Sequence, residues 1–263
     1  MTTVNDILNF LETIAPTYMK MDWDTVGLLC GRRDKVVKTV FVALDPFESV
    51  CHEAAQNNAD LLITHHPLIF EATNRITADT DFGRCVLFLA QQGISHINAH
   101  TNLDCAPGGV NDVLAERLGL QNISVVDPFG VDADGHPWGL LRQGTVEKQP
   151  LDSFLSHVKT QLDCLGLRYA DGGKPVCKVA VGGGSCGSEL QHVAAAGCDT
   201  FITADVKYNQ FWQAKALGIN LIDAGHFYTE NPICQVLAQR LQAAFPEIQV
   251  VLSQKHTDCA KFF

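Results

Sequence analysis

Two stretches of this chain show the same order of predicted elements, and this repetition restricts the possible folds more than any other feature. Residues 38–64 predict a strand, a turn, a helix and a second strand, and residues 178–203 predict the same series. Further along, residues 93–100 resemble residues 218–226. Strands that alternate with helices form mostly parallel sheets whose faces those helices cover. The repeat therefore predicts two related α/β domains with mostly parallel sheets.

The boundary between the two domains is expected where prolines and glycines interrupt every longer element, between Asp127 and Pro150. We expect the first α/β domain over residues 1–127 together with 230–263, with the C-terminal segment packed back on it. The second domain, a diverged repeat of the first, is expected over residues 128–229. Ligands of open α/β sheets bind at the carboxyl ends of strands, so a site between the domains would use both sets of strand ends.

Composition narrows the possible partners. The chain has 263 residues, of which 46% are hydrophobic and 18% charged, so it has enough apolar material for one large or two moderate cores. Its net charge of -10 argues against the basic surface with which proteins bind nucleic acid. An apolar run of about 20 residues and a signal-peptide pattern are both missing, which predicts a cytoplasmic protein without a membrane partner.

The most suggestive strand end is the sequence Leu61-Leu62-Ile63-Thr64-His65-His66-Pro67. Its apolar run predicts a strand buried on both faces. Side chains alternate faces along a strand, so adjacent histidines share a pocket only where the chain has left strand geometry. Pro67 cannot extend the hydrogen-bond ladder, which favours that exit at His65 and His66. Both imidazoles could then converge on one site.

Further candidate ligands follow two other predicted strands. His100 and Asp104 follow residues 94–99, and His226 with Glu230 follows the matching strand of the second repeat. If a helix starts at Phe227, His226 and Glu230 lie four residues apart on one of its faces. Imidazole and carboxylate ligands without thiolate favour Zn, Mn, Fe or Co. One carboxylate can bridge two such ions, so the sequence predicts a centre of two divalent metal ions.

Each candidate also has a purely structural interpretation. A single histidine is usually a surface or core residue, Asp104 could cap the turn at 107–108, and Glu230 could stabilise the first turn of a helix. His100 is preferred as a residue that orients Asp104, or as an occasional ligand. Asp205 aligns with His66 in the repeat, so it is either a base near the metals or a helix N-cap.

A glycine run at residues 182–184 follows a predicted strand and invites a phosphate-loop interpretation. The G-x-x-x-x-G-K-[ST] pattern is absent there, and the G-x-G-x-x-G spacing of Gly182, Gly184 and Gly187 is by itself a weak signal. We therefore predict a plain turn.

Four sequence blocks resemble the signature blocks of the NGG-interacting-factor-three family, whose members are often named GTP cyclohydrolase I type 2 homologues. The blocks are Trp23-Asp24-Thr25-Val26-Gly27-Leu28, Thr64-His65-His66-Pro67-Leu68, His100-Thr101-Asn102-Leu103-Asp104 with Gly108-Gly109-Val110-Asn111, and Ala224-Gly225-His226-Phe227-Tyr228-Thr229-Glu230. They run in the family's order, except that Thr25 stands where the family usually has asparagine. The chain is similar to the short bacterial form, which lacks an extra middle domain.

The resemblance implies two α/β domains facing each other across a metal-containing cleft, and a ring-shaped homo-hexamer. Carried over by position, it implies the five metal ligands His65, His66, Asp104, His226 and Glu230, with Glu230 bridging two ions.

Three functions remain open at this point. The leading hypothesis is a dinuclear metal-dependent hydrolase acting on a nucleotide or related heterocycle, with GTP ring opening as the candidate that the family implies. Asp205 or His100 would then move the proton. The alternatives are a metal-dependent phosphoesterase and a non-catalytic metal-binding or protein-interaction scaffold. An enzyme should lose turnover but keep its fold when Asp104 or His226 becomes alanine, whereas a scaffold should keep partner binding.

Overall fold

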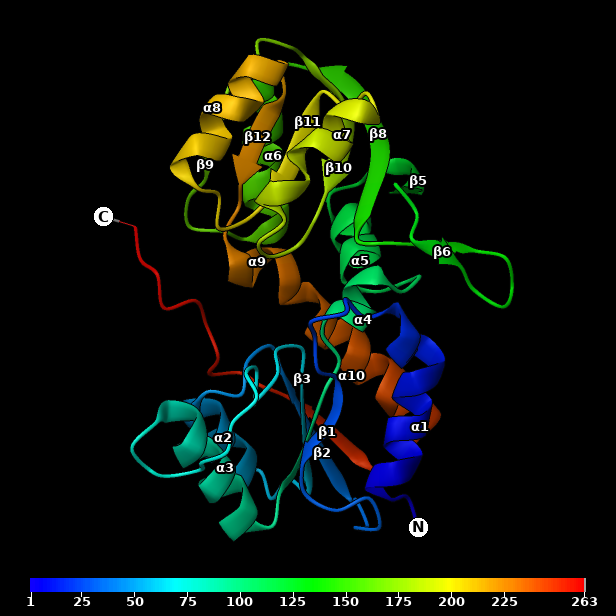
Figure 1. Cartoon of the computed structure of the whole chain (residues 1–263), viewed down its shortest axis with the longest axis vertical. Helices are drawn as coiled ribbons and strands as arrows, with labels where there is room; N and C mark the ends of the chain where they lie inside the picture. Colours follow the sequence, from blue (N-terminus) through cyan, green and yellow to red (C-terminus); the bar gives the residue numbers. More distant parts are fainter. Residues whose placement is uncertain (263) are drawn as a thin grey trace. The chain divides into compact units, whose positions relative to one another are not determined.

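The computed structural model describes residues 1–262, which form two compact units (Figure 1). The first unit comprises Met1–Leu103 and Ile233–Thr257, and the second comprises Asp104–Pro232 with residues 258–262. Each unit contains one large sheet covered by helices, so the chain has the mixed α/β fold that its repeat predicts. No helix in this described part of the chain is both long and apolar enough to cross a bilayer.

The sheet of the first unit has five strands in the order β1-β4-β3-β2-β13. The strands are β1 (Gly27–Cys30), β2 (Thr39–Ala43), β3 (Leu61–Thr64), β4 (Ser95–Asn98) and β13 (Gln249–Leu252). Only the edge strand β1 is antiparallel to its neighbour. The central strands β2, β3 and β4 are buried throughout, as expected for parallel strands covered on both faces.

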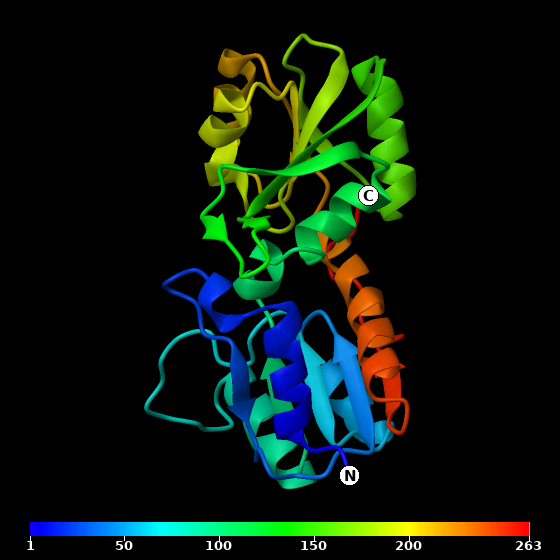
Figure 2. The ribbon, with the colours of Figure 1, turned by 90° about the vertical axis from the view of Figure 1, so that its right-hand side faces the viewer.

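Helices cover both faces of this sheet (Figures 1 and 2). Helices α2 (Glu48–Gln56) and α3 (Asp81–Gln92) lie on one face and α1 (Val4–Ile14) and α10 (Pro232–Ala244) on the other. Local signals set their ends: Thr3 and Asp6 form a capping box at the start of α1, and Gly93 ends α3 in the left-handed conformation. The C-terminal segment thus packs back on the first unit over Ile233–Thr257, whereas residues 258–262, which we also expected there, belong to the second unit.

The sheet of the second unit has six strands in the order β5-β8-β10-β11-β12-β9. They are β5 (Gln121–Val126), β8 (Leu141–Gln149), β9 (Arg168–Ala170), β10 (Val176–Val181), β11 (Thr200–Thr203) and β12 (Asn220–Asp223). Strands β10, β11 and β12 are parallel, but the other three pairings are antiparallel. A mostly parallel sheet is therefore wrong for this unit. The chain between β5 and β8 contains only the hairpin β6 (Gly130–Val131) and β7 (Pro137–Trp138), without the crossover helix that parallel neighbours need.

Helices cover this sheet on both faces as well. Leu114 of α5 (Val110–Arg117) and Phe154 of α6 (Leu151–Leu162) pack with Val179 of the sheet. On the other face, α7 (Leu190–Ala195) and α8 (Tyr208–Leu217) contribute Val193 and Ala214 to a second apolar cluster. Because α5 belongs to this core, the second unit begins at Asp104, whereas we expected the break at residue 127.

The two units share the order of their parallel strands, β2-β3-β4 in the first and β10-β11-β12 in the second. Each unit also contains a matching hydrogen bond between an aspartate side chain and a backbone N–H. Asp60 Oδ2 accepts a hydrogen bond of 2.8 Å from the Lys38 N–H, and Asp199 Oδ2 accepts one of 2.8 Å from the Lys178 N–H. In both units an aspartate before one strand therefore binds the backbone at the start of its neighbour, as the repeat in the sequence implies.

Candidate metal centre

Three imidazoles converge at the carboxyl edge of the first sheet. His65 and His66 follow β3, and His100 follows β4, which lies beside it. The Thr64 hydroxyl donates to the His66 carbonyl at 2.6 Å, in keeping with a chain that leaves strand geometry here. The ring centroids are 5.0 Å apart for His65 and His66, 5.3 Å for His65 and His100, and 5.6 Å for His66 and His100. One ring nitrogen from each histidine lies within 4.8 Å of the other two, a spacing at which all three could bind one metal ion.

Each ring is oriented through its Nδ1 atom. Nδ1 of His65 lies 2.8 Å from the carbonyl oxygen of Ala99. Nδ1 of His66 lies 2.6 Å from Asp45 Oδ1, and Nδ1 of His100 lies 2.9 Å from Asp24 Oδ1. A carbonyl only accepts, so the His65 Nδ1 carries a proton and its Nε2 keeps a lone pair for a metal. The carboxylates favour the same tautomer in the other two rings, an arrangement common around metal-bound histidines.

Asp45 is held between two imidazoles and connects the site to the C-terminal segment of the first unit. Its Oδ2 lies 2.7 Å from Nε2 of His256, which follows β13. Burial by itself raises the pKa of Asp45, but hydrogen bonds from His256 and His66 outweigh it, so the pKa lies well below its usual value. Asp45 is therefore an anion that supports His66. At Asp24, hydrogen bonds from His100 and Thr101 similarly outweigh burial and lower the pKa.

Asp24, Asp45 and His256 were not identified as site residues from the sequence. A signal for Asp45 existed, because it follows β2 at the same sheet edge as the histidines. His256 occurs in none of the sequence motifs that identified the other residues and offered no comparable signal.

Replacing Asp45 by asparagine is expected to weaken binding of divalent metal by about 10–100-fold, the usual cost of removing a carboxylate that supports a metal-binding histidine. The substitution keeps the size of the side chain and removes the charge opposite His66. Competition with a chromophoric chelator would measure the affinity. Asp34→Asn, at an exposed aspartate paired with Arg32, is the matched control and should leave it unchanged. Equal affinities in both variants would contradict the supporting role.

The second unit brings together His226, Glu230 and Asp205. His226 and Glu230 are the first and last residues of α9 (His226–Glu230), and His226 Nε2 lies 2.9 Å from Glu230 Oε2. Nδ1 of His226 lies 2.7 Å from Asp205 Oδ2. The N-cap of α8 is Lys207, so Asp205 does not cap that helix. Asp205 instead contacts the imidazole that we expected to bind metal, and Glu230 is buried with 4% of its surface exposed.

Asp104 lies in α4 (Thr101–Cys105), and the segment that follows it is fixed by a buried arginine. Arg142 of β8 donates to the carbonyl oxygens of Cys105 and Ala106 at 3.2 and 3.1 Å. It also forms a bidentate pair with Asp112, at 2.7 and 3.0 Å. Asp104 itself is buried, with 6% of its surface exposed. Arg142 and Asp112 were not singled out from the sequence, since neither occurs in a recognisable motif.

The glycine run after β10 forms the plain turn that we expected. The Gly183 N–H donates to Asn111 Oδ1 at 2.7 Å, and the Gly184 N–H donates to Thr229 Oγ1 at 3.1 Å. These N–H groups bind the protein and do not point at an anion. Gly184 has a φ of +61°, and a Cβ atom there would collide with Glu230 Oε1 and lie 3.0 Å from His226 Nε2. The glycine therefore leaves room for these two side chains.

These donor atoms suit a transition metal. The first unit offers imidazoles with fixed tautomers, and the second offers buried carboxylates and an imidazole, without thiolate among the named groups. Zn, Mn, Fe and Co accept such mixed nitrogen and oxygen ligands. Burying carboxylates such as Asp104 and Glu230 is costly unless positive charge compensates them, which a divalent ion would supply.

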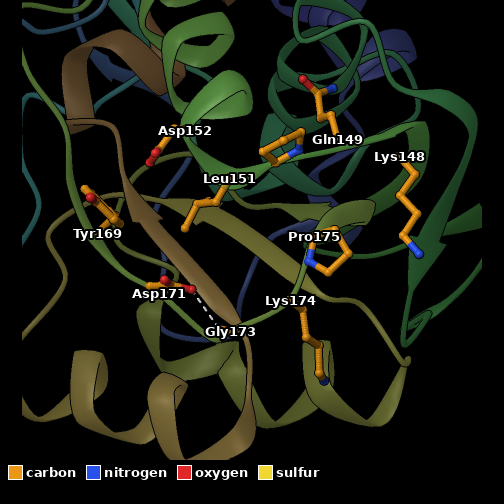
Figure 3. Close-up of a pocket in the computed structure, with 10 residues that line it drawn as sticks. Lys148, Gln149, Leu151, Asp152, Tyr169, Asp171, Gly173, Lys174 and Pro175 are labelled. Carbon is orange, nitrogen blue, oxygen red and sulfur yellow. Dashed lines mark hydrogen bonds between the residues drawn. The ribbon is translucent and has the colours of Figure 1, made fainter.

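A concave region of about 660 Å³ lies elsewhere in the second unit (Figure 3). It is formed by the end of β8, the start of α6, and β9 with the loop after it. Gln149 pairs with Val176, so this region lies at the amino end of β10, whereas His226 follows the carboxyl end of the parallel strand β12. Two lysines and two aspartates line it, and the side chains drawn in Figure 3 do not converge on one point. We do not assign chemistry to it.

This chain is similar to known proteins along nearly its whole length. The family model described as Duf34/NIF3 (NGG1p interacting factor 3) matches residues 2–259. A "GTP cyclohydrolase 1 type 2 homolog" from Clostridium perfringens is 34% identical, covering 98% of this chain and 99% of that protein. A protein of the same name from Streptomyces coelicolor is 36% identical over 92% of this chain and 86% of its own length. The crystal structure of a Bacillus cereus protein related to NIF3 superposes with a TM-score of 0.94 at 27% identity, covering 100% and 99% of the two chains.

Proposed function

This chain belongs to the Duf34/NIF3 (NGG1p interacting factor 3) family, and from that premise we propose that it is a metal-dependent hydrolase acting on a nucleotide or related heterocycle. The observation that carries the proposal is the cluster of His65, His66 and His100, in which each Nδ1 is already bound within the first unit. Rings held in this way are prepared to bind metal through Nε2. The printed name of the curated relatives supports GTP as the first substrate to test.

We further propose that two divalent ions, of Zn, Fe, Mn or Co, are held by His65, His66, Asp104, His226 and Glu230, with Glu230 bridging. Such ions would polarise the substrate and activate water for attack on it. The protein's own groups have separate tasks in this proposal. Asp24 and Asp45 hold His100 and His66 in position, as their hydrogen bonds suggest.

Proton transfer is assigned to Asp205 and His100. Asp205 accepts from the His226 ring and has a side chain that is 55% exposed, so it can exchange protons with solvent. The Nδ1 of His100 lies 2.9 Å from the buried Asp24 carboxylate, which holds the ring in position beside His65 and His66. We also propose that the protein forms a homo-hexameric ring and is located in the cytoplasm.

The decisive experiment is metal analysis of the purified protein followed by assays of the same preparation. GTP, other nucleotides and generic phosphoesters would be offered before and after treatment with a chelator, and again after each metal is restored. Metal-dependent ring opening of GTP supports the proposal. Metal-dependent cleavage of phosphoesters alone would make the protein a phosphoesterase, and bound metal without turnover of any substrate would favour a scaffold.

A further inference from the structure

Two exposed aromatic side chains lie beside the histidine cluster of the first unit. Trp23 and Phe70 are 60% and 58% exposed, and their ring centroids lie 5.9 Å apart. Both also contact His100, at 6.0 Å from Trp23 and 6.3 Å from Phe70. The metal hypothesis gives these rings no task, although they reach the same imidazole from two different loops.

Trp23 is held in place by its neighbour in the chain. Asp24 is buried, accepts from the Thr101 N–H at 3.0 Å and contacts Nδ1 of His100 at 2.9 Å. The tryptophan backbone is therefore tied to the segment that carries His100. Phe70 lies in the connection between β3 and α3, which runs over residues 65–80 without a helix or strand. Long connections of this kind in compact units are often functional.

The rings are inclined so that they can receive another ring. The planes of Trp23 and Phe70 meet at 60°, and both rings are more than half exposed. Each ring therefore remains largely accessible to solvent although the two rings are neighbours. A flat aromatic ring can stack on one of these surfaces and meet the edge of the other, both of which are favourable aromatic geometries. Stacking on aromatic side chains is also how proteins bind nucleobases without reading their sequence.

We propose that Trp23 and Phe70 bind the planar ring of a heterocyclic substrate next to the histidine cluster. The inference deepens the proposed function and rests on it for the identity of the reacting group. Two rings match the size of one heterocycle, whereas a stable protein interface buries about 800 Å² on each partner. The neighbouring imidazoles would place the reacting carbon of that ring within reach of the proposed metals.

The test is calorimetric titration of the metal-loaded protein with GTP and with inorganic tripolyphosphate, which has the charge of the phosphate chain but no ring. Trp23→Ala is expected to weaken GTP binding by about tenfold, the order found when a stacking side chain is removed from a base. Phe70→Leu, which keeps apolar volume, should also weaken it, and Trp23→Phe should keep most of it. Tripolyphosphate affinity and metal content should not change. The matched control is Trp212→Ala, since Trp212 of α8 is also 60% exposed.

Several results would overturn the inference. The first is equal GTP affinity in Trp23→Ala and Trp212→Ala. The second is wild-type protein that binds tripolyphosphate as tightly as GTP, or that binds no nucleotide. The third is loss of bound metal in Trp23→Ala. A changed oligomeric state in that variant, measured by sedimentation, would assign the rings to a contact between copies. Ring-dependent GTP binding without metal-dependent turnover would instead refute the proposed hydrolase and leave the ring site standing.

Discussion

Replacing His65 by alanine is expected to remove tightly bound divalent metal and to lower hydrolytic turnover by roughly a thousandfold, the equivalent of the several kcal/mol that metal assistance supplies. His65 is the most buried of the three converging imidazoles, with 1% of its surface exposed. Its Nδ1 is bound to the Ala99 carbonyl, so Nε2 is the nitrogen that it can offer to a metal. Elemental analysis by mass spectrometry, together with GTP turnover, would measure both effects.

The matched control for this experiment is His52→Ala. His52 lies in α2 of the same unit, and its side chain is 49% exposed. This variant should keep wild-type metal content and turnover. A His65→Gln variant, which fills most of the same volume, separates loss of the ligand from loss of packing and should resemble His65→Ala. Full metal content in both His65 variants would refute the assignment of His65 as a ligand.

Replacing Arg142 by leucine is expected to destabilise the second unit by about 3–5 kcal/mol, the usual cost of removing one partner from a buried ion pair. The arginine is 1% exposed and neutralises Asp112 through two hydrogen bonds. It also satisfies the carbonyl oxygens of Cys105, Ala106 and Gly139. The leucine variant would leave the partly buried Asp112 carboxylate, whose side chain is 18% exposed, without its cation, and would loosen the segment that follows Asp104.

Because the protein has two units, global unfolding need not be two-state, and hydrogen exchange of the β8 and β10 amides in urea is the better measure. The double variant Arg142→Leu, Asp112→Leu should recover much of the loss, since it removes the isolated charge. Arg117→Leu is the control, because Arg117 is exposed and donates to one carbonyl, that of Gln161. An Arg142→Leu protein as stable as Arg117→Leu would show that the buried pair contributes nothing.

Some local features of the chain follow from short stretches of sequence. The helix Val4–Ile14 and the helix Asp81–Gln92 with Gly93 after it carry such local signals, and the strand Leu61–Thr64 has the bounds expected from its apolar run. Each depends on neighbouring residues: an apolar period of 3.6, a glycine that accepts positive φ, or a short apolar run that ends before a proline. The convergence of His65 and His66 was also foreseen, whereas His100, which we expected to orient Asp104, joins them with its Nδ1 on Asp24.

Other features depended on contacts between distant segments. Asp45 and His256 are 211 positions apart, and no local pattern connects them. The antiparallel strands of the second sheet and the transfer of α5 to the second unit follow from which apolar faces pack together, which spacing along the chain does not encode.

The sequence by itself determined the α/β class, the repeat, the family and the strand ends that carry the histidines, because these follow from periodicity and motifs over short distances. Only the tertiary structure decided how each imidazole is oriented, and it did so through Asp24, Asp45 and the Ala99 carbonyl. The structure also showed that Trp23 and Phe70 lie together beside His100. The physical reason is the same in both cases: the direction of a side chain is set by partners that reach it through the fold, and a linear pattern records the residue but not its partner.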